Sequence, residues 1–435
     1  MQMPALLFFI LHPLWRLVDL LTSKRPDYWA FATHHLHTDR FIENQRALFE
    51  HVKADPTLRK IVFYRGPTPE LHIEDAVNYE VVRHGSLRGF CLLARCKVVF
   101  LTHSIAMDYS LRWNGGRFSV LKLALKRRCV VNLWHGIPLK RLLYAANEDT
   151  FRHTDRVPYR ARERRGYAGL IASSDIDSYA MSAMFYPLNY RQTWVTGLPR
   201  NDFLALPEAQ LPSYIRSSLT RIRHLRNERK LVVYAPTYRQ TDVRRSARYY
   251  RFSDEEIARL KSLLQAHNAV LAYRPHYFRN SSEYFNLDRY VDNEYIFDAS
   301  QEAVPEFSAL ARELDVLVTD YSSVYIDALY LGKPVICFGY DLAHYRSHED
   351  GLLYDMNLAF PGPVTQNFED LLSAIGSRLT MDPASTAREQ ETARKLFFRY
   401  NDTLNSSRVA ERVRRCLAGR HDPTPPDASG QTPTT

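Results

Sequence analysis

The sequence predicts an α/β protein made of two doubly wound, Rossmann-like halves that face a cleft. Short apolar strands alternate with helical segments along the chain, as in βαβ units with a parallel sheet. The alternation occurs in two successive series, and polar motifs follow the strands of both. With 435 residues, 45% of them hydrophobic and 24% charged, the chain is long enough for two domains with substantial cores.

Residues 314–338 show most clearly how a strand, a polar turn, a helix and a second strand follow one another in this chain. Its apolar run at 316–318 predicts a parallel strand that is buried on both faces. Ser322 and Ser323 then open a helix, and a second apolar strand follows at 335–338. A parallel sheet binds ligands at the carboxyl ends of its strands, where a helix N-terminus favours phosphate. Taken alone, this segment fits a plain capped helix equally well.

The predicted strands divide the chain into domains. The first series is expected at residues 61–64, 79–82, 98–102, 130–134, 170–172 and 194–196. The second series is expected at residues 231–234, 270–273, 295–297, 316–318 and 335–338. The expected parts are therefore a helical segment at 1–55, an α/β domain at 56–205, a linker at 206–230, a second α/β domain at 231–420 and a disordered tail at 421–435.

The N-terminal segment is apolar but interrupted. Charged residues and a proline break it, so no uninterrupted stretch approaches the roughly 18 apolar residues of a membrane-spanning helix. We expect it to lie at a membrane interface, with Trp15, Arg16, Lys24 and Arg25 at the level of the lipid headgroups. The alternative is a hydrophobic helix that packs on the protein's own core.

Charge and cysteine content restrict the class of protein. The formal net charge of +10 predicts attraction to polyanions, such as acidic lipid, a phosphate-rich substrate or nucleic acid. The five cysteines are scattered and show no zinc-ligand spacing, which indicates a reducing compartment and no structural metal.

Polar motifs at predicted strand ends carry the candidate chemistry. His135 follows a strand, with a glycine and a proline beyond it, and its side chain suits proton transfer near neutrality. Lys140 lies close enough in sequence to hold an anionic group. Taken alone, His135 is more often a hydrogen-bonded structural histidine.

Three further motifs follow strands of the second series. Thr237 and Arg239 come after one strand, and Arg274 and His276 come after the next. Hydroxyl, guanidinium and imidazole groups all donate hydrogen bonds to phosphate oxygens. With Ser322, Ser323 and Asp327 in the third motif, these residues predict a cleft for an anionic, nucleotide-like ligand. The sequence contains no Walker A motif, no GxGxxG after the first strand, no HExxH and no GxSxG.

At these positions the chain resembles the CDP-glycerol glycerophosphotransferase family, which contains teichoic-acid and capsule primases and polymerases. The matching segments are NLWHGIPLK at 132–140, GLPRND at 197–202, YAPTYR at 234–239, RPH at 274–276 and VTDYSSVYIDALYLGKPVI at 318–336. The resemblance extends from about residue 98 to residue 412 and keeps the family's order.

The resemblance implies a GT-B-type fold and a reaction. The family moves a polyol phosphate from a CDP-activated donor to an acceptor hydroxyl and releases CMP, with no metal or cofactor implied. His135 would be the general base, and His276 would stabilise the donor's pyrophosphate. The donor-binding residues would be Thr237, Arg239, Arg274, Ser322, Ser323 and Asp327, and the acceptor- or anion-binding residues would be Lys140, Arg200 and Asn201.

The resemblance also implies partners and a location. We expect a CDP-glycerol-like donor, an anionic lipid-linked or saccharide acceptor, and peripheral attachment to the cytoplasmic face of an anionic cell membrane. An oligomer stays possible. Ile137 and Gln240 depart from the family's usual Thr and Asp, so CDP-ribitol or a nucleotide sugar stays open as donor.

Two other functions are compatible with parts of the pattern. One is a GT-B glycosyltransferase for capsule or lipopolysaccharide, in which a carboxylate base would be more usual than His135. The other is a cationic nucleic-acid-binding protein. The basic clusters lack interleaved aromatic stacking residues, so nucleic acid is not expected as a partner.

Overall fold

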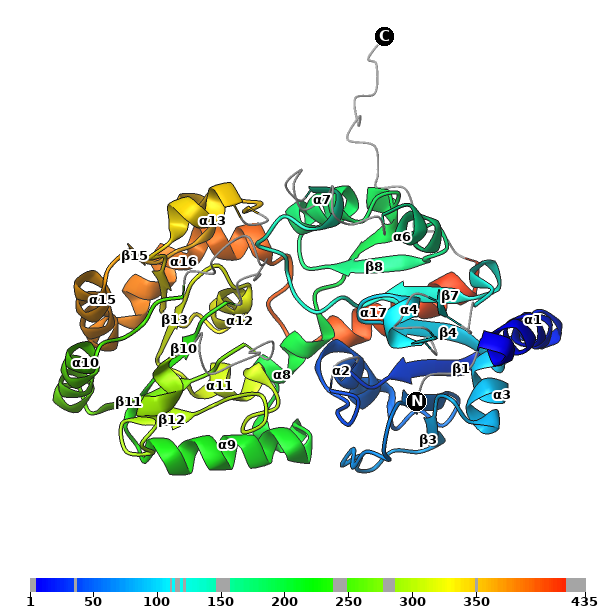
Figure 1. The fold of residues 1–435 in the computed structure, drawn as a ribbon, viewed down its shortest axis with the longest axis horizontal. Helices are drawn as coiled ribbons and strands as arrows, with labels where there is room; N and C mark the ends of the chain where they lie inside the picture. Colours follow the sequence, from blue (N-terminus) through cyan, green and yellow to red (C-terminus); the bar gives the residue numbers. More distant parts are fainter. Residues whose placement is uncertain are drawn as a thin grey trace, which may run out of the picture.

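The protein folds into two α/β halves that lie side by side (Figure 1). The structure, a computed structural model, describes residues 5–34, 37–109, 112–113, 118–119, 123–145, 157–237, 249–276, 286–348 and 351–419. The predicted tail at 421–435 lies outside these residues. One cluster of buried apolar side chains extends through both halves, and each half has a second cluster of its own.

The first half contains a seven-stranded parallel sheet in the order β3-β2-β1-β4-β7-β8-β9. Its strands are β1 (Arg25–Ala32), β2 (Arg59–Tyr64), β3 (Tyr79–Arg83), β4 (Cys96–Leu101), β7 (Cys129–Asn132), β8 (Gly169–Ala172) and β9 (Thr193–Val195). A separate two-stranded antiparallel pair consists of β5 (Arg112–Trp113) and β6 (Phe118–Ser119).

The second half contains a six-stranded parallel sheet in the order β12-β11-β10-β13-β14-β15. Its strands are β10 (Lys230–Ala235), β11 (Ala269–Tyr273), β12 (Ile296–Asp298), β13 (Val316–Thr319), β14 (Val335–Phe338) and β15 (Val364–Thr365). In both sheets the strand order reverses next to the first strand. Ligands of doubly wound folds bind at this reversal, outside the carboxyl ends of the strands.

Helices connect the strands and cover the sheets. In the first half they are α1 (Ala5–Leu21), α2 (Glu43–Val52), α3 (Leu87–Arg95), α4 (Ile105–Asp108), α6 (Val157–Arg164), α7 (Asp175–Met184) and α8 (Asp202–Ala205). The others are α9 (Ser213–Arg226), α10 (Asp254–Ala266), α11 (Phe307–Glu313), α12 (Val324–Tyr330), α13 (Leu342–His348), α14 (Met356–Ala359), α15 (Phe368–Thr380), α16 (Pro383–Phe397) and α17 (Asn405–Leu417).

The strand β1 corrects the expectation that residues 1–55 are helical. It pairs with both β2 and β4 and so occupies the centre of the first sheet. Trp29, Ala30 and Phe31 are completely buried. These apolar residues lie on both faces of the strand, as a central parallel strand requires, and Pro26 precedes them. Because this strand directly follows an apolar, interrupted helix, its own apolar residues look in the sequence like part of the same helical segment.

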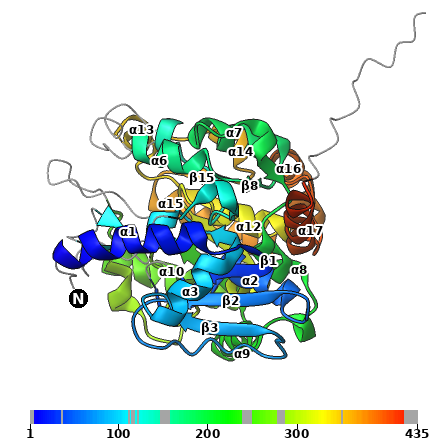
Figure 2. The same ribbon diagram turned by 90° about the vertical axis from the view of Figure 1, so that its right-hand side faces the viewer.

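The helix α1 packs on the outside of the first half beside α3 (Figure 2). Trp15 is buried against Phe90, with ring centroids 5.9 Å apart. Asp19 is buried too, and it accepts a 3.0 Å hydrogen bond from Nη1 of Arg128 and another from Nζ of Lys24. The expectation that Trp15 and Lys24 lie among lipid headgroups is therefore wrong, because Asp19 needs cationic partners in the protein.

The opposite face of α1 is apolar and exposed. Phe9, Leu14, Leu17 and Leu21 each expose more than half of their surface. Within the described part of the chain, no helix combines the length and apolar content that crossing a membrane requires.

Two helices lie where the predicted domains meet. The segment expected to be a linker contains α9, whose residues Ile215, Leu219 and Ile222 are fully buried and which packs on α11. The last helix, α17, follows the second half in sequence but packs on α2 and β7 of the first (Figure 1). The chain therefore returns from the second half to the first at its C-terminal end. The predicted domain boundaries stay predictions.

Replacing Asp19 with alanine should lower the free energy of unfolding by about 3–5 kcal/mol, because the buried guanidinium of Arg128 would lose its carboxylate partner. Chemical denaturation measures this change. The control is Asp27→Ala, which removes a solvent-exposed ion pair with Arg25 and should cost much less, because water screens that pair. Equal losses in both variants would contradict the assignment of Asp19 as the residue that docks α1.

Candidate active site

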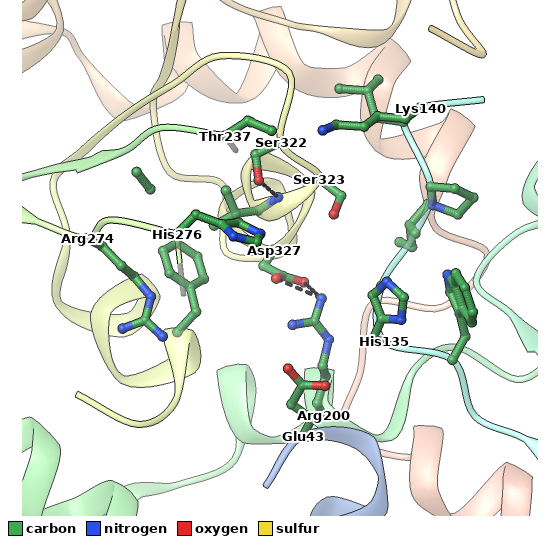
Figure 3. A pocket seen from close by; sticks show the side chains of 18 of the residues that line it. Glu43, His135, Lys140, Arg200, Thr237, Arg274, His276, Ser322, Ser323 and Asp327 are labelled. Carbon is green, nitrogen blue, oxygen red and sulfur yellow. Dashed lines mark hydrogen bonds and ion pairs between the residues drawn. The ribbon is translucent and has the colours of Figure 1, made fainter. Parts of the chain in front are cut away.

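A cavity of about 320 Å³ lies between the two halves (Figure 3). Its walls include segments that follow β1, β4, β7, β10, β11, β12 and β13, so the carboxyl ends of both sheets face it. All the predicted site residues line the cavity except Arg239 and Asn201. The predicted residues that line the cavity are His135, Lys140, Arg200, Thr237, Arg274, His276, Ser322, Ser323 and Asp327.

The loop after β7 holds His135 in place. Asn44 of α2 donates from its side-chain amide to the carbonyls of Leu133 and Trp134, at 3.0 Å each. The side chain of Asn132 accepts from the amide of Trp134 at 2.8 Å. Trp134 has a φ of 48°, a conformation that a non-glycine residue rarely adopts. These bonds maintain a strained turn, as is common in active sites.

His135 faces the second half. Its ring stacks on that of His103, with centroids 4.8 Å apart. At the next residue, a Cβ on Gly136 would lie 3.4 Å from both Oγ of Ser323 and Nη2 of Arg200. The loop of the first half thus reaches the start of α12 in the second.

The segments after β10 and β13 form the opposite wall. The carboxylate of Asp320 accepts a 2.9 Å hydrogen bond from the amide of Thr237 and so ties the two segments together. Ser322 Oγ accepts a long 3.4 Å bond from the amide of Val324. Ser323 occupies the N-cap position, but its side chain makes no capping bond. The hydroxyls of both serines lie on the cavity wall, where the sequence predicted phosphate contacts.

His276 and Lys140 lie near each other, although they come from different halves. Burial and the positive charge of Lys140 lower the pKa of His276 to about 4, although Asp320 opposes the shift. His276 is therefore neutral at pH 7 and can donate one N–H group to a phosphate oxygen, but it supplies no charge. The ammonium of Lys140 lies 5.4 Å from the ring centroid of Tyr345.

Arg274 has a structural task that the sequence did not indicate. Its Nη1 donates to the carbonyls of Ala299, at 2.9 Å, and Val304, at 2.7 Å. These bonds fix the segment after β12, so this nitrogen is already engaged within the protein. The remainder of the side chain still lines the cavity.

Arg200 and Asp327 form an ion pair between the two halves. Nη2 of Arg200 donates to the carboxylate of Asp327 at 2.9 Å, and both side chains are largely buried. Burial raises the pKa of Asp327, and the guanidinium of Arg200 opposes the shift. The sequence assigned these residues to the acceptor and the donor separately, whereas the structure pairs them.

Two predicted residues are not placed in the cavity. Asn201 is buried beside it but is not part of its lining. Arg239 lies outside the described residues. The described ranges contain no group of three or more His, Cys, Asp or Glu side chains that could hold a metal ion.

The cavity also contains residues that sequence reasoning missed. Glu43 begins α2, His34 follows β1, His103 follows β4, and Gln301 follows β12. Strand-end position could have identified His103, since its strand was expected. His34 was hidden because its strand was assigned to a helix, and Glu43 had no sequence signal.

A family model for CDP-glycerol:poly(glycerophosphate) glycerophosphotransferases matches residues 19–415. The chain belongs to this family. The match covers both sheets and every segment that lines the cavity.

Individual relatives act in teichoic acid synthesis. The teichoic acid glycerol-phosphate transferase of Staphylococcus aureus is 25% identical over 396 residues, which are 90% of this chain and 94% of that protein. The ribitol-phosphate primase of Bacillus spizizenii is 24% identical and covers 88% of this chain and 90% of the relative. The poly(glycerol phosphate) polymerase of Bacillus subtilis is 29% identical over 56% of this chain, but the match spans only 31% of that polymerase.

Solved structures support the fold. The wall teichoic acid polymerase TagF superimposes with a TM-score of 0.71 at 19% identity, over 95% of each chain. A UDP-N-acetylglucosamine 2-epimerase gives a TM-score of 0.51 at 10% identity, over 93% of this chain and 99% of that one. Together with the two parallel sheets, these likenesses confirm the predicted GT-B-type α/β fold.

Replacing His276 with glutamine should make stability less sensitive to acid. Between pH 6.5 and about 4 the unfolded chain binds a proton at His276 that the folded protein does not, so stability falls as pH falls through this window. Glutamine does not bind this proton, so the slope of the free energy of unfolding against pH should become shallower by up to about 1.4 kcal/mol per pH unit. Denaturant titrations from pH 4 to 7 measure it. The control is His224→Gln on the exposed surface of α9. If the slope in His276→Gln equals that of the wild type, His276 is not buried and neutral in the folded protein.

Proposed function

We propose that this protein transfers a polyol phosphate from a CDP-activated donor to an acceptor hydroxyl and releases CMP. The proposed pathway is the synthesis of a teichoic-acid-like or capsule polymer. The supporting observation is that His135 of one half and the two serines at the start of α12 of the other line one cavity, and that the loop at Gly136, next to His135, reaches Ser323. Glycerol phosphate is the first candidate, because glycerol-phosphate enzymes are among the matched relatives and a TagF variant was soaked with CDPG. The match to a ribitol-phosphate primase makes CDP-ribitol the second candidate.

In the proposed reaction His135 removes the proton from the acceptor hydroxyl. The acceptor oxygen then attacks the β-phosphorus of the donor and forms a new P–O bond. The bond between that phosphorus and the bridging oxygen breaks, and its electron pair leaves with CMP. Positioning and electrostatic stabilisation supply most of the rate enhancement in phosphoryl transfer.

The donor's pyrophosphate would lie against the second half. Thr237, Ser322 and Ser323 offer hydroxyl donors, and neutral His276 offers an N–H group. Lys140 supplies positive charge from the first half. Arg239, which follows the same motif as Thr237, stays a proposed donor contact, and a metal-free mechanism stays a prediction from the sequence.

The rival function is glycosyl transfer from a nucleotide sugar, because one fold of this type can carry more than one chemistry. The two reactions release different products. A panel of CDP-glycerol, CDP-ribitol and UDP-sugars, offered with membrane extract, should give CMP only from a CDP-polyol. UDP release from a sugar donor, with no CMP from either polyol donor, would overturn the proposal.

Replacing His135 with alanine should reduce transfer by at least about 100-fold, since general base catalysis typically contributes 10²–10⁴-fold. The affinity for CDP should change little, because the donor's pyrophosphate is proposed to lie on the other half. CMP release and calorimetric CDP binding measure the two effects. The control is His72→Ala, outside the cavity lining. Activity of His135→Ala close to wild type would exclude His135 as the base.

The exposed apolar face of α1 supports peripheral attachment to an anionic membrane, together with the net charge of +10. Leu17→Glu combined with Leu21→Glu should weaken binding to phosphatidylglycerol vesicles at least about tenfold, because each buried leucine contributes about 1.5–3 kcal/mol. Vesicle sedimentation measures the binding. Leu404→Glu, at a similarly exposed leucine far along the chain, is the control. Unchanged sedimentation of the double variant would exclude α1 as the membrane contact.

A further inference from the structure

Glu43 places a carboxyl group on the cavity wall. Neither the sequence motifs nor the proposed reaction assigns a role to it. It is the first residue of α2 and has a φ of 60°, which is unusual for a residue with a side chain. Its Oε2 atom is buried and has no hydrogen-bond partner among the described residues. Strained backbone and an unpaired polar atom are costly, and they persist mainly at functional sites.

The charged side chains around Glu43 each form hydrogen bonds with other groups. Arg200 donates to Asp327, and Arg274 donates from Nη1 to two backbone carbonyls. Glu306 accepts hydrogen bonds from the backbone amide of Glu43, at 2.7 Å, and from the hydroxyl of Tyr214, at 2.8 Å. Two buried side-chain atoms of this cluster are left without a hydrogen-bond partner among the described residues, Oε2 of Glu43 and Nε of Arg200.

The electrostatics favour a neutral ligand at Glu43. Burial raises its pKa to about 7, with Glu306 and Asp327 adding to the shift and Arg200 and Arg274 opposing it. A phosphate group would be repelled by a carboxylate and by the two acidic neighbours. A hydroxyl group can donate a hydrogen bond to the carboxylate and can accept one from the protonated form.

The position of Glu43 fits the far end of a substrate. Figure 3 places Glu43 beside Arg200, at the end of the cavity away from Thr237 and Ser322. A molecule whose phosphates lie against Thr237 and Ser322 would extend its remaining part toward Glu43. A polyol offers several hydroxyl groups there.

We propose that Glu43 is a substrate-binding residue that forms a hydrogen bond with a hydroxyl group of a polyol. This inference rests on the proposed function and extends it to the recognition of the polyol itself. The hydroxyl belongs either to the polyol of the CDP-activated donor or to the terminal polyol of the acceptor. The chemistry is the same, and the two sources are separated by experiment.

The test replaces Glu43 with methionine, which has a similar length but cannot accept this hydrogen bond. Glu43→Gln keeps one acceptor oxygen and should have a smaller effect. The matched control is Glu50→Met on the same helix, where the carboxylate pairs with Arg46 and Lys53 outside the cavity. Thermal melting establishes that each variant is folded.

Three constants are then measured: the KM for CDP-glycerol, the KM for a synthetic lipid acceptor that ends in glycerol phosphate, and the Kd for CDP. We expect Glu43→Met to raise one KM by about 10- to 100-fold, the effect of losing one hydrogen bond to a charged group. A rise for CDP-glycerol identifies the donor's polyol, and a rise for the lipid identifies the acceptor's. The Kd for CDP, which carries no polyol, should stay within about twofold.

Two results would overturn the inference while leaving the proposed function intact. One is wild-type KM values in both Glu43 variants. The other is an equal loss of affinity for CDP and CDP-glycerol, which would indicate a structural effect or a contact with the ribose of the nucleotide. If the methionine variant does not fold, the same criteria apply to Glu43→Gln, with an expected rise of about 3- to 10-fold. If the wild-type protein transfers no polyol phosphate from any CDP-polyol, the proposed function fails, and this inference fails with it.

Discussion

The parallel direction of all strands in both main sheets is the constraint on which the rest of the structure depends. Parallel strands place their carboxyl ends at one edge, and the two sheets direct these edges at a common cavity. Residues from seven separate strand ends meet there without being close in sequence. The buried ion pair of Arg200 and Asp327 then joins the two edges. Breaking such a pair leaves an uncompensated charge, so the pair favours one arrangement of the halves.

The two walls of the cavity differ in chemistry. The first half contributes His135, stacked on His103, together with the ammonium of Lys140. The second half contributes hydroxyl groups and a neutral imidazole, which donate hydrogen bonds without adding charge. If His135 is the base, as proposed, this arrangement of a base on one side and hydrogen-bond donors on the other suits the proposed reaction between two substrates. Glu43 adds a third environment, suited to neutral hydroxyl groups.

Local sequence pattern gave a wrong prediction at two places and missed a structural contact at a third, each for a physical reason. The strand β1 follows an apolar, interrupted helix, and only its pairing with two neighbours distinguishes it from more helix. Trp15 and Lys24 have the composition of a membrane anchor, but Asp19 and Arg128 draw that face of α1 into the protein. Arg274 lines the cavity, and its role as a donor contact stays a prediction, but local pattern gave no sign that its Nη1 bonds to two carbonyls from a later strand end.

The sequence alone determined the α/β class, most of the strands and the strand-end residues that meet in the cavity. Apolar runs that alternate with turn residues can be recognised in a short stretch of sequence. Because the strands are parallel, the residues that follow them meet at one edge of the sheet and form a site. Only the tertiary structure decided which groups face each other, because contacts between distant segments have no local signature. It paired Arg200 with Asp327, made His276 neutral through burial and Lys140, and placed Glu43 on the cavity wall. The segment around Ser322 and Ser323 is equally consistent with a plain capped helix by itself. It is part of a two-sided cavity because the loop that holds His135 and Gly136 reaches it from the other half.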